Sequence, residues 1–214
     1  WLVQVLEEMC VLGMVEEVLH RPFNVVSVGI TEKSDFHPTK KPFRLRLLYD
    51  GRPVNENLQF PTMHMEGHGK NRHIYEEDDF LLDFDLTNGF YHAGLLPLSR
   101  EFVGFAFAGR FFRYVGLPMG CAPVPFLFQV LVWSLVKRWR RLGIRVTNFL
   151  DDFLFPHKRR FSAMLRTFIE GEFRRYGLRM NGPKSHPIPH KVSRSLGIEV
   201  NLELMRFIIP EDKK

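Results

Sequence analysis

Apolar residues recur along the chain at both helical and strand spacing, which predicts a protein of mixed α and β structure. Near the start, Leu2, Val5, Leu6 and Met9 follow helical spacing, and Gly13 is a stop signal. The run VVSVGI predicts a strand, TEKSDFHPTKKP a basic loop, and FRLRLLY a second strand that completes a hairpin. Residues 61–79 are expected to form a loop with a short helix.

The middle of the chain predicts a strand, a hairpin and a long helix. FLLDFDL reads as a buried strand interrupted by acids, and VGFAFAG with RFFRYVG forms a hairpin that turns at Ala108 and Gly109. After Pro125, the run FLFQVLVWSLVKRWRRLG is apolar on nearly every face. It therefore predicts a mostly buried helix, with cations at the carboxyl end where the helix dipole favours them.

The last third predicts a second hairpin, an amphipathic helix and three short strands. RVTNFLDDFLF places two aspartates at a hairpin tip, and apolar residues at helical spacing run from Phe161 to Tyr176, with Gly177 as the cap. LRMN, SLGIEVN and MRFIIP are expected to be strands. The element order indicates an α+β fold in which helices cover one face of an antiparallel sheet.

Composition narrows the class of protein. The 214 residues are 45% hydrophobic and 25% charged, and 21 of them are Phe, which predicts a globular chain with an aromatic core. The net charge of +6 favours a polyanionic partner, although many basic proteins bind no nucleic acid. Cys10 and Cys121 fit reduced thiols of an intracellular protein, cytoplasmic or nuclear. We expect no membrane partner, since no apolar run is long enough to span a bilayer, and the start at Trp1 suggests a piece of a longer protein.

Asp85, Asp151 and Asp152 are the candidate catalytic groups. Phe and Leu flank all three, so the carboxylates would lie at the edge of a hydrophobic sheet and need a cation to balance their charge. Magnesium suits such a site, and two ions about 3.5–4 Å apart would serve phosphoryl transfer. The plainer alternatives are a solvated Asp-Asp turn and a strand-end acid at Asp85. Asp83 is interpreted as a structural acid, or as one that lies outside the direct ligands of the metal.

Six segments resemble, in order, the motifs of retroelement reverse transcriptases. They are FRLRLLYDGRPVN, FDLTNGFYH, YVGLPMGCAPVPFLFQ, NFLDDFLF, YGLRMNGPKS and SLGIEVN. LGIRVTNFLDDFLF and VNLELMRFIIPEDK resemble the tyrosine-recombinase (DIRS-like) retrotransposons most, with long-terminal-repeat elements next. The resemblance implies a right-hand polymerase palm with a fingers subdomain and no thumb. Fingers would occupy residues 1–60 and 93–123, and palm residues 61–92 and 124–214.

The resemblance also implies an RNA-directed DNA polymerase that adds dNTPs to a primer on an RNA or DNA template, within a larger polyprotein or complex. Two Mg²⁺ ions, or Mn²⁺ in their place, would be held by Asp85 and Asp151, with Asp152 as a weaker ligand and the Leu86 carbonyl assisting. Lys184 would be a candidate proton donor near the pyrophosphate, and Phe90 a steric gate that selects deoxynucleotides. Other implied nucleotide contacts are Lys33, Arg46, Asn88, Gly89 and Met119. Implied template and primer contacts are Pro125, Phe128, Gln129, Phe149, Leu196 and Gly197.

Several implied roles have simpler alternatives. Phe90 and Phe128 could be core residues, Lys33 and Lys184 surface lysines, and Arg46 an ordinary ion-pair partner. Phe149 also stands where the family usually has tyrosine. The competing functions are a catalytically inactive reverse-transcriptase-derived module that binds RNA or protein, and an RNA-dependent RNA polymerase. The three retained acids favour the enzyme over the inactive module, and the bulky Phe90 disfavours RNA synthesis.

Overall fold

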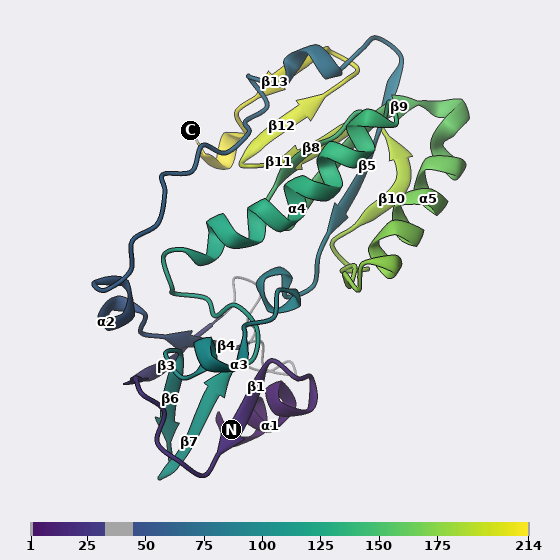
Figure 1. The fold of residues 1–214 in the computed structure, drawn as a ribbon. Coiled ribbons are helices and arrows are strands. Elements are labelled where there is room, and N and C mark those ends of the chain that lie inside the picture. Colours follow the sequence, from purple (N-terminus) through teal and green to yellow (C-terminus); the bar gives the residue numbers. More distant parts are fainter. Residues whose placement is uncertain (1, 33–44, 214) are drawn as a thin grey trace. The chain divides into compact units, whose positions relative to one another are not determined.

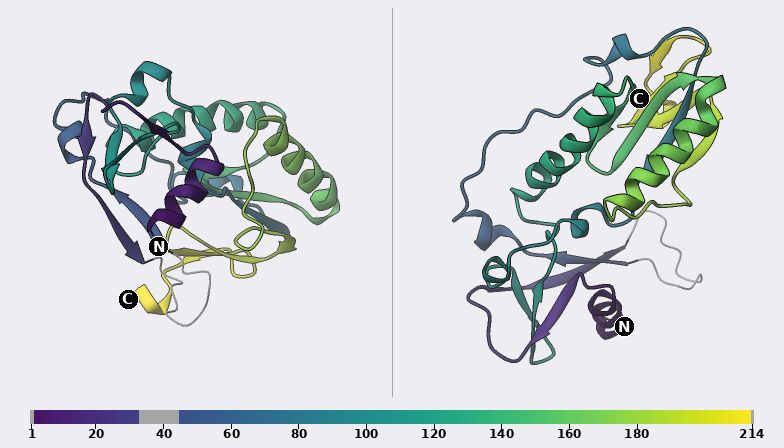
Figure 2. Two further views of the ribbon diagram at one scale, coloured as in Figure 1. Left: turned by 90° about the horizontal axis from the view of Figure 1, so that it is seen from below. Right: turned by 45° about the vertical axis from the view of Figure 1, so that its right-hand side comes forward.

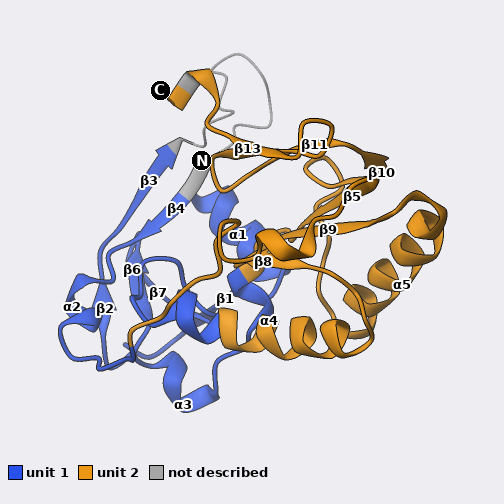
Figure 3. Cartoon of the chain, turned by 90° about the horizontal axis from the view of Figure 1, so that it is seen from above, with its two compact units in different colours: residues 1–61, 90–128 blue, residues 62–89, 129–214 orange. Residues whose placement is uncertain are grey.

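The computed structural model describes residues 2–32 and 45–213. The chain forms two compact units, which Figure 3 colours separately: unit 1 comprises residues 1–61 and 90–128, and unit 2 comprises residues 62–89 and 129–214. The boundaries predicted from the sequence follow residues 60, 92 and 123, and those of the compact units follow residues 61, 89 and 128. No helix in the described part of the chain is both long and apolar enough to cross a membrane.

Unit 1 contains a four-stranded sheet of order β1-β7-β6-β2, in which β2 is parallel to β6 and the other pairs are antiparallel. Strands β3 and β4 form a separate antiparallel pair. The strands are β1 (Val15–Val18), β2 (Val25–Val26), β3 (Val28–Glu32), β4 (Leu45–Tyr49), β6 (Gly104–Phe107) and β7 (Arg110–Tyr114). The helices are α1 (Leu2–Val11), α2 (Arg52–Asn55) and α3 (Pro97–Arg100), and the 3-10 turn η2 (Gly89–His92) lies at the boundary.

Several local predictions for unit 1 are confirmed. α1 ends before Gly13, which has a φ of +68°, and the β6–β7 hairpin turns at Ala108 and Gly109 with φ of 50° and 74°. The strand predicted over VVSVGI is instead two strands, because Ser27 separates a pair of residues that join β6 from a run that joins β4. The sequence reading also missed β1, whose Glu16 pairs with Arg113 across the sheet.

Gly120 is the glycine of the Leu-Pro-Met-Gly segment, and its backbone fits a narrow space. Its φ is +107°, and a Cβ at this position would lie 2.5 Å from the Tyr49 carbonyl oxygen. The side-chain amide of Asn55 donates to the Gly120 carbonyl at 3.0 Å and its Oδ1 accepts from the Ala122 N–H at 2.7 Å. These contacts fix the loop that leads into α4 (Val124–Arg141).

Gly120→Ala is expected to lower the free energy of unfolding by about 2–4 kcal/mol, because the new methyl group meets backbone and the φ is strained. Gly109→Ala is the matched control: its φ is +74°, but nothing lies within 4 Å of its added Cβ. It should cost only about 1–2 kcal/mol. Denaturant unfolding of both variants measures the difference, and equal losses would contradict the close approach at Gly120.

Unit 2 is built on an antiparallel four-stranded sheet of order β10-β5-β9-β8. α4 and α5 cover one face of this sheet (Figures 1 and 2), as the sequence predicted for the fold class. The strands are β5 (Asp79–Asp85), β8 (Thr147–Phe149), β9 (Asp152–Lys158), β10 (His186–His190), β11 (Val192–Ser195), β12 (Ile198–Asn201) and β13 (Arg206–Ile208). The remaining elements are α5 (Ser162–Arg175) and the 3-10 turns η1 (Arg72–Ile74), η3 (Arg159–Phe161) and η4 (Glu211–Lys213).

Aromatic side chains join the helices to the sheet. Trp139 of α4 is fully buried, and its ring centroid lies 5.8 Å from those of Phe155 on β9 and Phe173 on α5. Phe84 of β5 contacts both phenylalanines edge-on. Burial of large rings contributes much of the stability of such a core, so this cluster holds β5 and β9 in place.

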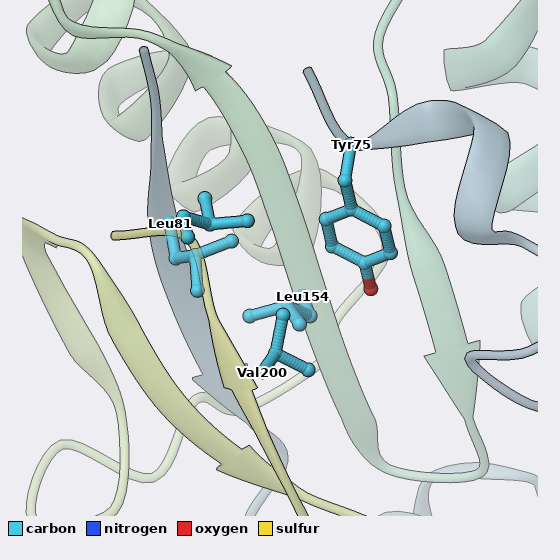
Figure 4. Packing of buried hydrophobic residues seen from close by; sticks show 5 residues of the cluster. Tyr75, Leu81, Leu154 and Val200 are labelled. Carbon is cyan, nitrogen blue, oxygen red and sulfur yellow. The ribbon is translucent and has the colours of Figure 1, made fainter. Parts of the chain in front are cut away.

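The opposite face of the sheet is covered by the three-stranded sheet β11-β12-β13. Figure 4 shows the contact, in which Leu81 of β5 and Leu154 of β9 pack with Val200 of β12 and with Tyr75. Odd-numbered residues of β5 therefore face this second layer, whereas Phe84 faces the helices. Asp83 and Asp85 lie on the same face as Leu81.

Two predictions for residues 124–214 are wrong, and a third holds only in part. The helix predicted after Pro125 forms as α4 but is not mostly buried, because Leu127, Val130 and Leu131 make an exposed stripe along it. LRMN is not a strand but contributes one isolated bridge, from Met180 to Leu86. The predicted strand SLGIEVN is also interrupted, because Leu196 and Gly197 have φ of 54° and 74° and form the turn between β11 and β12.

Candidate active site

Two of the three candidate acids face each other across the central strands of unit 2. Asp85 is the last residue of β5 and lies directly opposite Asp152, the first residue of β9. Opposed residues of an antiparallel pair project to the same face, so both carboxylates lie on the face away from α4 and α5. Asp151 occupies the β8–β9 turn, where its carbonyl accepts a hydrogen bond from the Leu86 N–H at 3.0 Å.

The turn that carries Asp151 is held from inside the protein. Leu150 has a φ of 53°, a conformation that is strained for a branched residue. The side chain of Gln129 accepts a hydrogen bond from the Leu150 N–H at 2.8 Å, and the amide group of Asn148 donates to the Leu150 carbonyl at 2.8 Å. Gln129 and Asn148 are both buried and bond to each other. Their amides therefore stabilise a turn that Leu150 would otherwise disfavour.

The loop between α5 and β10 holds the end of β5. Ser185 Oγ accepts a hydrogen bond from the Asp85 N–H at 3.0 Å, and the Asn181 N–H donates to the Asp85 carbonyl at 2.8 Å. Lys184 lies between these anchors, and its Nζ is 3.9 Å from Asp85 Oδ2. The loop thus positions both an acid and a cation.

Burial and the neighbouring carboxylates raise the pKa of Asp152 to about 7. Burial by surrounding atoms is the largest cause, although Asp152 keeps an exposed surface. The negative charges of Asp151 and Asp85 and a hydrogen bond with Asp85 raise the pKa further, and Lys184 partly opposes them. The cluster therefore carries more negative charge than its surroundings balance.

Asp152→Asn is expected to stabilise the metal-free protein at pH 8 but not at pH 4. The ordinary pKa of this group is 3.8 and the folded value is about 7. Between these values the folded state holds a proton that the unfolded chain has lost, so the free energy of unfolding falls as pH rises. Removing the carboxylate removes that fall.

Urea unfolding at several pH values in the presence of a chelator measures this effect. Asp78→Asn is the matched control, because Asp78 is exposed and its φ of 62° suits asparagine. A pH profile for Asp152→Asn parallel to those of the parent and of Asp78→Asn would contradict the raised pKa of Asp152.

The site fits a hard divalent cation that keeps open positions for substrate. Among the described residues, no group of three or more His, Cys, Asp or Glu side chains is arranged to hold a metal ion. Magnesium commonly uses one or two carboxylates and takes its other ligands from water and phosphates. Asp85 faces Asp152, and the pKa of Asp152 is raised by burial and by the negative charges of Asp151 and Asp85. This donor set therefore suits magnesium better than a metal that needs a complete protein cage.

A cavity of about 920 Å³ opens beside these acids within unit 2. One side of it is formed by Asp83, Asp85 and Asp152, and another by Lys184 and by β11 around Ser193. Asp85, Asp152 and strand β11 therefore line one cavity.

Unit 2 contains most of the residues that the sequence singled out. Asp85, Leu86, Asp151, Asp152 and Lys184 come together as described. Asn88 is exposed with a φ of 55°, Gly89 is buried, Phe149 lies opposite Asp152, and Leu196 and Gly197 form the β11–β12 turn. Gln129 has a further role that the sequence did not indicate, because its buried amide supports the Asp151 turn.

The other predicted residues belong to unit 1. Phe90 packs edge-on against the fully buried Phe128, with ring centroids 5.3 Å apart, and Met119 and Pro125 are half-buried. Lys33 lies outside the described residues. Arg46 pairs with Thr31 through the β3–β4 backbone, but its side chain also lies outside the described set. The nucleotide and template roles of these residues stay predictions.

Sequence reasoning missed Asn148, Ser185 and the partners of Asp83. Asn148 is a polar residue inside an apolar strand, and that pattern was an available signal for a buried hydrogen bond. Ser185 and Ser193 carried no such signal, because their partners lie 100 and 110 residues away in the chain.

Comparison with known proteins gives a consistent result. The family model described as reverse transcriptase (RNA-dependent DNA polymerase) matches residues 34–200. Protein P of duck hepatitis B virus (strain China) is 28% identical over 138 residues, which cover 62% of this chain and 17% of that protein. The genome polyprotein of petunia vein clearing virus (isolate Shepherd) is 25% identical over 187 residues, covering 77% of this chain and 8% of the polyprotein. The chain thus spans a small part of these relatives.

Solved structures of similar fold include foamy viral protease-reverse transcriptases. One, in complex with double-stranded DNA, has a TM-score of 0.83 and 16% identity, covering 99% of this chain and 35% of that one. The native enzyme of prototype foamy virus has a TM-score of 0.73 and 21% identity, covering 90% of this chain and 24% of that one. These likenesses confirm the predicted α+β palm-and-fingers fold. Because the family model matches more than half of the residues, the chain belongs to the reverse transcriptase (RNA-dependent DNA polymerase) family.

Proposed function

We propose that the chain carries out RNA-directed DNA synthesis, in which the 3′-hydroxyl of a primer attacks a deoxynucleoside triphosphate and pyrophosphate leaves. The observation that carries this proposal is the facing pair Asp85 and Asp152, with Asp151 in the adjoining turn and Lys184 beside them, in a chain of this family. The competing proposal, an inactive module that binds RNA or protein, is not favoured, because a module without catalysis has no need to gather these charges.

Asp85 and Asp151 would hold two divalent ions, Mg²⁺ or in its place Mn²⁺, with Asp152 as a weaker ligand and the Leu86 carbonyl assisting. When bound, such ions neutralise phosphate charge and make the primer hydroxyl a better nucleophile. The Lys184 ammonium, which is largely exposed, could donate a proton to the departing pyrophosphate. The buried amides of Gln129 and Asn148 would keep the Asp151 turn fixed during the reaction.

Substrate contacts are proposed from the motifs that carry each residue. Phe90 would exclude the 2′-hydroxyl of a ribonucleotide, and the backbone N–H groups of Asn88 and Gly89 would bind the triphosphate. The positive φ of Asn88 supports a contact of the triphosphate with backbone N–H groups, since turns with this conformation can point successive N–H groups at an anion. Leu196 and Gly197, at a hairpin turn, would touch the primer. The other contacts proposed here are Lys33, Arg46 and Met119 for the nucleotide and Pro125, Phe128, Gln129 and Phe149 for the template-primer.

Primer extension tests the proposal. A labelled DNA primer annealed to an RNA template is incubated with the chain, deoxynucleotides and Mg²⁺, and parallel reactions contain ribonucleotides or a DNA template. The proposal predicts extension with deoxynucleotides on RNA. Extension only with ribonucleotides would favour an RNA-dependent RNA polymerase instead. Binding of the RNA without any extension would favour the inactive module.

We also propose that the chain is part of a larger polyprotein and lies nearest the tyrosine-recombinase (DIRS-like) retrotransposons. Its short span of the viral relatives supports the first point, and the two stretches quoted above support the second. A phylogenetic tree that groups the chain with hepadnaviral or plant viral polymerases would contradict the subgroup. A native gene product no longer than this chain would contradict the polyprotein.

A further inference from the structure

Asp83 is a largely buried carboxylate that lies directly opposite the apolar Leu154 of β9. It lies two residues before Asp85 on β5, on the face that Leu81 and Leu154 present to the β11-β12-β13 layer. Its side chain is 17% exposed, and its Oδ1 is buried with no hydrogen-bond partner among the described residues. Burying a carboxylate there costs free energy unless strong hydrogen bonds offset it.

The other oxygen, Oδ2, receives two hydrogen bonds from separate strands. Ser193 Oγ on β11 donates at 2.6 Å, and His190 Nε2 at the end of β10 donates at 3.2 Å. Ser193 is buried, and the second ring nitrogen of His190 faces the Ile188 carbonyl at 2.9 Å. Asp83 therefore connects three elements, β5, β10 and β11, through one atom.

The connection lies between two parts of unit 2 to which the proposed function assigns roles. Toward the carboxyl end of β5, Asp83 is followed by Asp85. Along β11, Ser193 is followed after three residues by the Leu196–Gly197 turn, about 10 Å further on at strand spacing. Asp83, Asp85, Asp152 and Ser193 all line the same cavity of about 920 Å³. A bond from Asp83 to Ser193 thus sets the distance between the walls of that cavity.

We propose that Asp83 is a positioning residue that, through Ser193, fixes the β11–β12 turn relative to the catalytic carboxylates. This inference rests on the proposed function, in which that turn contacts the primer. We therefore expect loss of the Asp83–Ser193 hydrogen bond to weaken the correct placement of the primer, while Asp85, Asp151 and Asp152 keep their own contacts. His190 supports the same carboxylate from the β10 side.

Ser193→Ala and Ser193→Thr test the proposal without changing any proposed catalytic group. Alanine removes the donor, whereas threonine keeps a hydroxyl. Ser134→Ala is the matched control, because Ser134 is exposed on α4 and donates only to the Leu131 carbonyl of its own helix. Thermal melting establishes that each variant is folded.

Hydrogen exchange of the nucleic-acid-free chain provides the first readout. We expect backbone amides of residues 192–197 to exchange about 10-fold faster in Ser193→Ala, with threonine close to the parent and Ser134→Ala unchanged. Primer extension provides the second readout: the KM for template-primer should rise about 10-fold in Ser193→Ala with kcat within about 3-fold, and threonine should restore it.

The two readouts separate the ways in which the proposal could fail. Unchanged hydrogen exchange in Ser193→Ala would show that the Asp83–Ser193 hydrogen bond does not hold the β11–β12 turn. Faster exchange with an unchanged KM would show a bond that is only structural, and would overturn the positioning role. A parent chain that extends no primer would overturn the proposed function and the positioning role with it. The hydrogen-exchange data would still report whether the Asp83–Ser193 hydrogen bond holds the turn.

Discussion

Asp151→Asn is expected to reduce primer extension by about 10³-fold or more while leaving the fold intact. The substitution keeps the size of the side chain and removes one negative charge from the proposed cation site. A loss of 10³-fold corresponds to about 4 kcal/mol of transition-state stabilisation, which is typical when a main electrostatic contact is removed. Steady-state extension rates on an RNA template at saturating Mg²⁺ measure it.

The control for this prediction is Asp78→Asn, which makes the same change of charge at an exposed position of unit 2. It should retain near-parent activity. Because the Asp151 turn is held by backbone bonds and by Gln129 and Asn148, both variants should melt near the parent temperature. Full activity of a folded Asp151→Asn chain would refute the proposed mechanism.

Phe90→Val is expected to admit ribonucleotides, with the preference for deoxynucleotides falling by about 10²-fold. A shortened side chain leaves room for a 2′-hydroxyl that the phenyl ring would otherwise exclude, and a steric clash of this kind is worth a few kcal/mol. The ratio of kcat/KM for dNTP and rNTP on one template measures the change.

Phe102→Val is the matched control for the gate, because Phe102 is an exposed phenylalanine in the same unit. Its sugar selectivity should equal that of the parent. Phe90 also packs against Phe128, so Phe90→Val should lose some stability as well. A variant that is destabilised but keeps its sugar preference would assign Phe90 to the core alone.

Local sequence signals predicted much of the fold. The double aspartate between apolar runs predicted the β8–β9 hairpin, and the period from Phe161 to Tyr176 predicted α5, which Gly177 follows with a φ of 69°. These elements could be recognised because hydrophobic period and turn chemistry are both encoded within a few residues.

Elements whose stability depends on distant partners were harder to recognise. β10 reads His-Pro-Ile-Pro-His, and two prolines argue against a strand in a sheet interior. The strand exists because β10 is at the edge of its sheet, bonded to β5 on one side only. β1 also depends on distant partners, because its two glutamates form ion pairs with arginines of β7 and α3.

The candidate site was only partly visible for the same reason. The motif series indicated Asp85, Asp151 and Asp152, but periodicity could not show that Asp152 is the residue opposite Asp85. The role of Asp83 depends on a serine 110 residues away, which no local pattern reveals.

Binding of Mn²⁺, followed by electron paramagnetic resonance as free Mn²⁺ disappears, tests the central claim that these acids share a cation site. The parent chain and Asp78→Asn should bind the ion alike at pH 8, whereas Asp85→Asn and Asp151→Asn should each weaken binding about 10-fold or more. Equal Mn²⁺ affinity in the parent chain and both site variants, with all of them folded, would contradict the shared site.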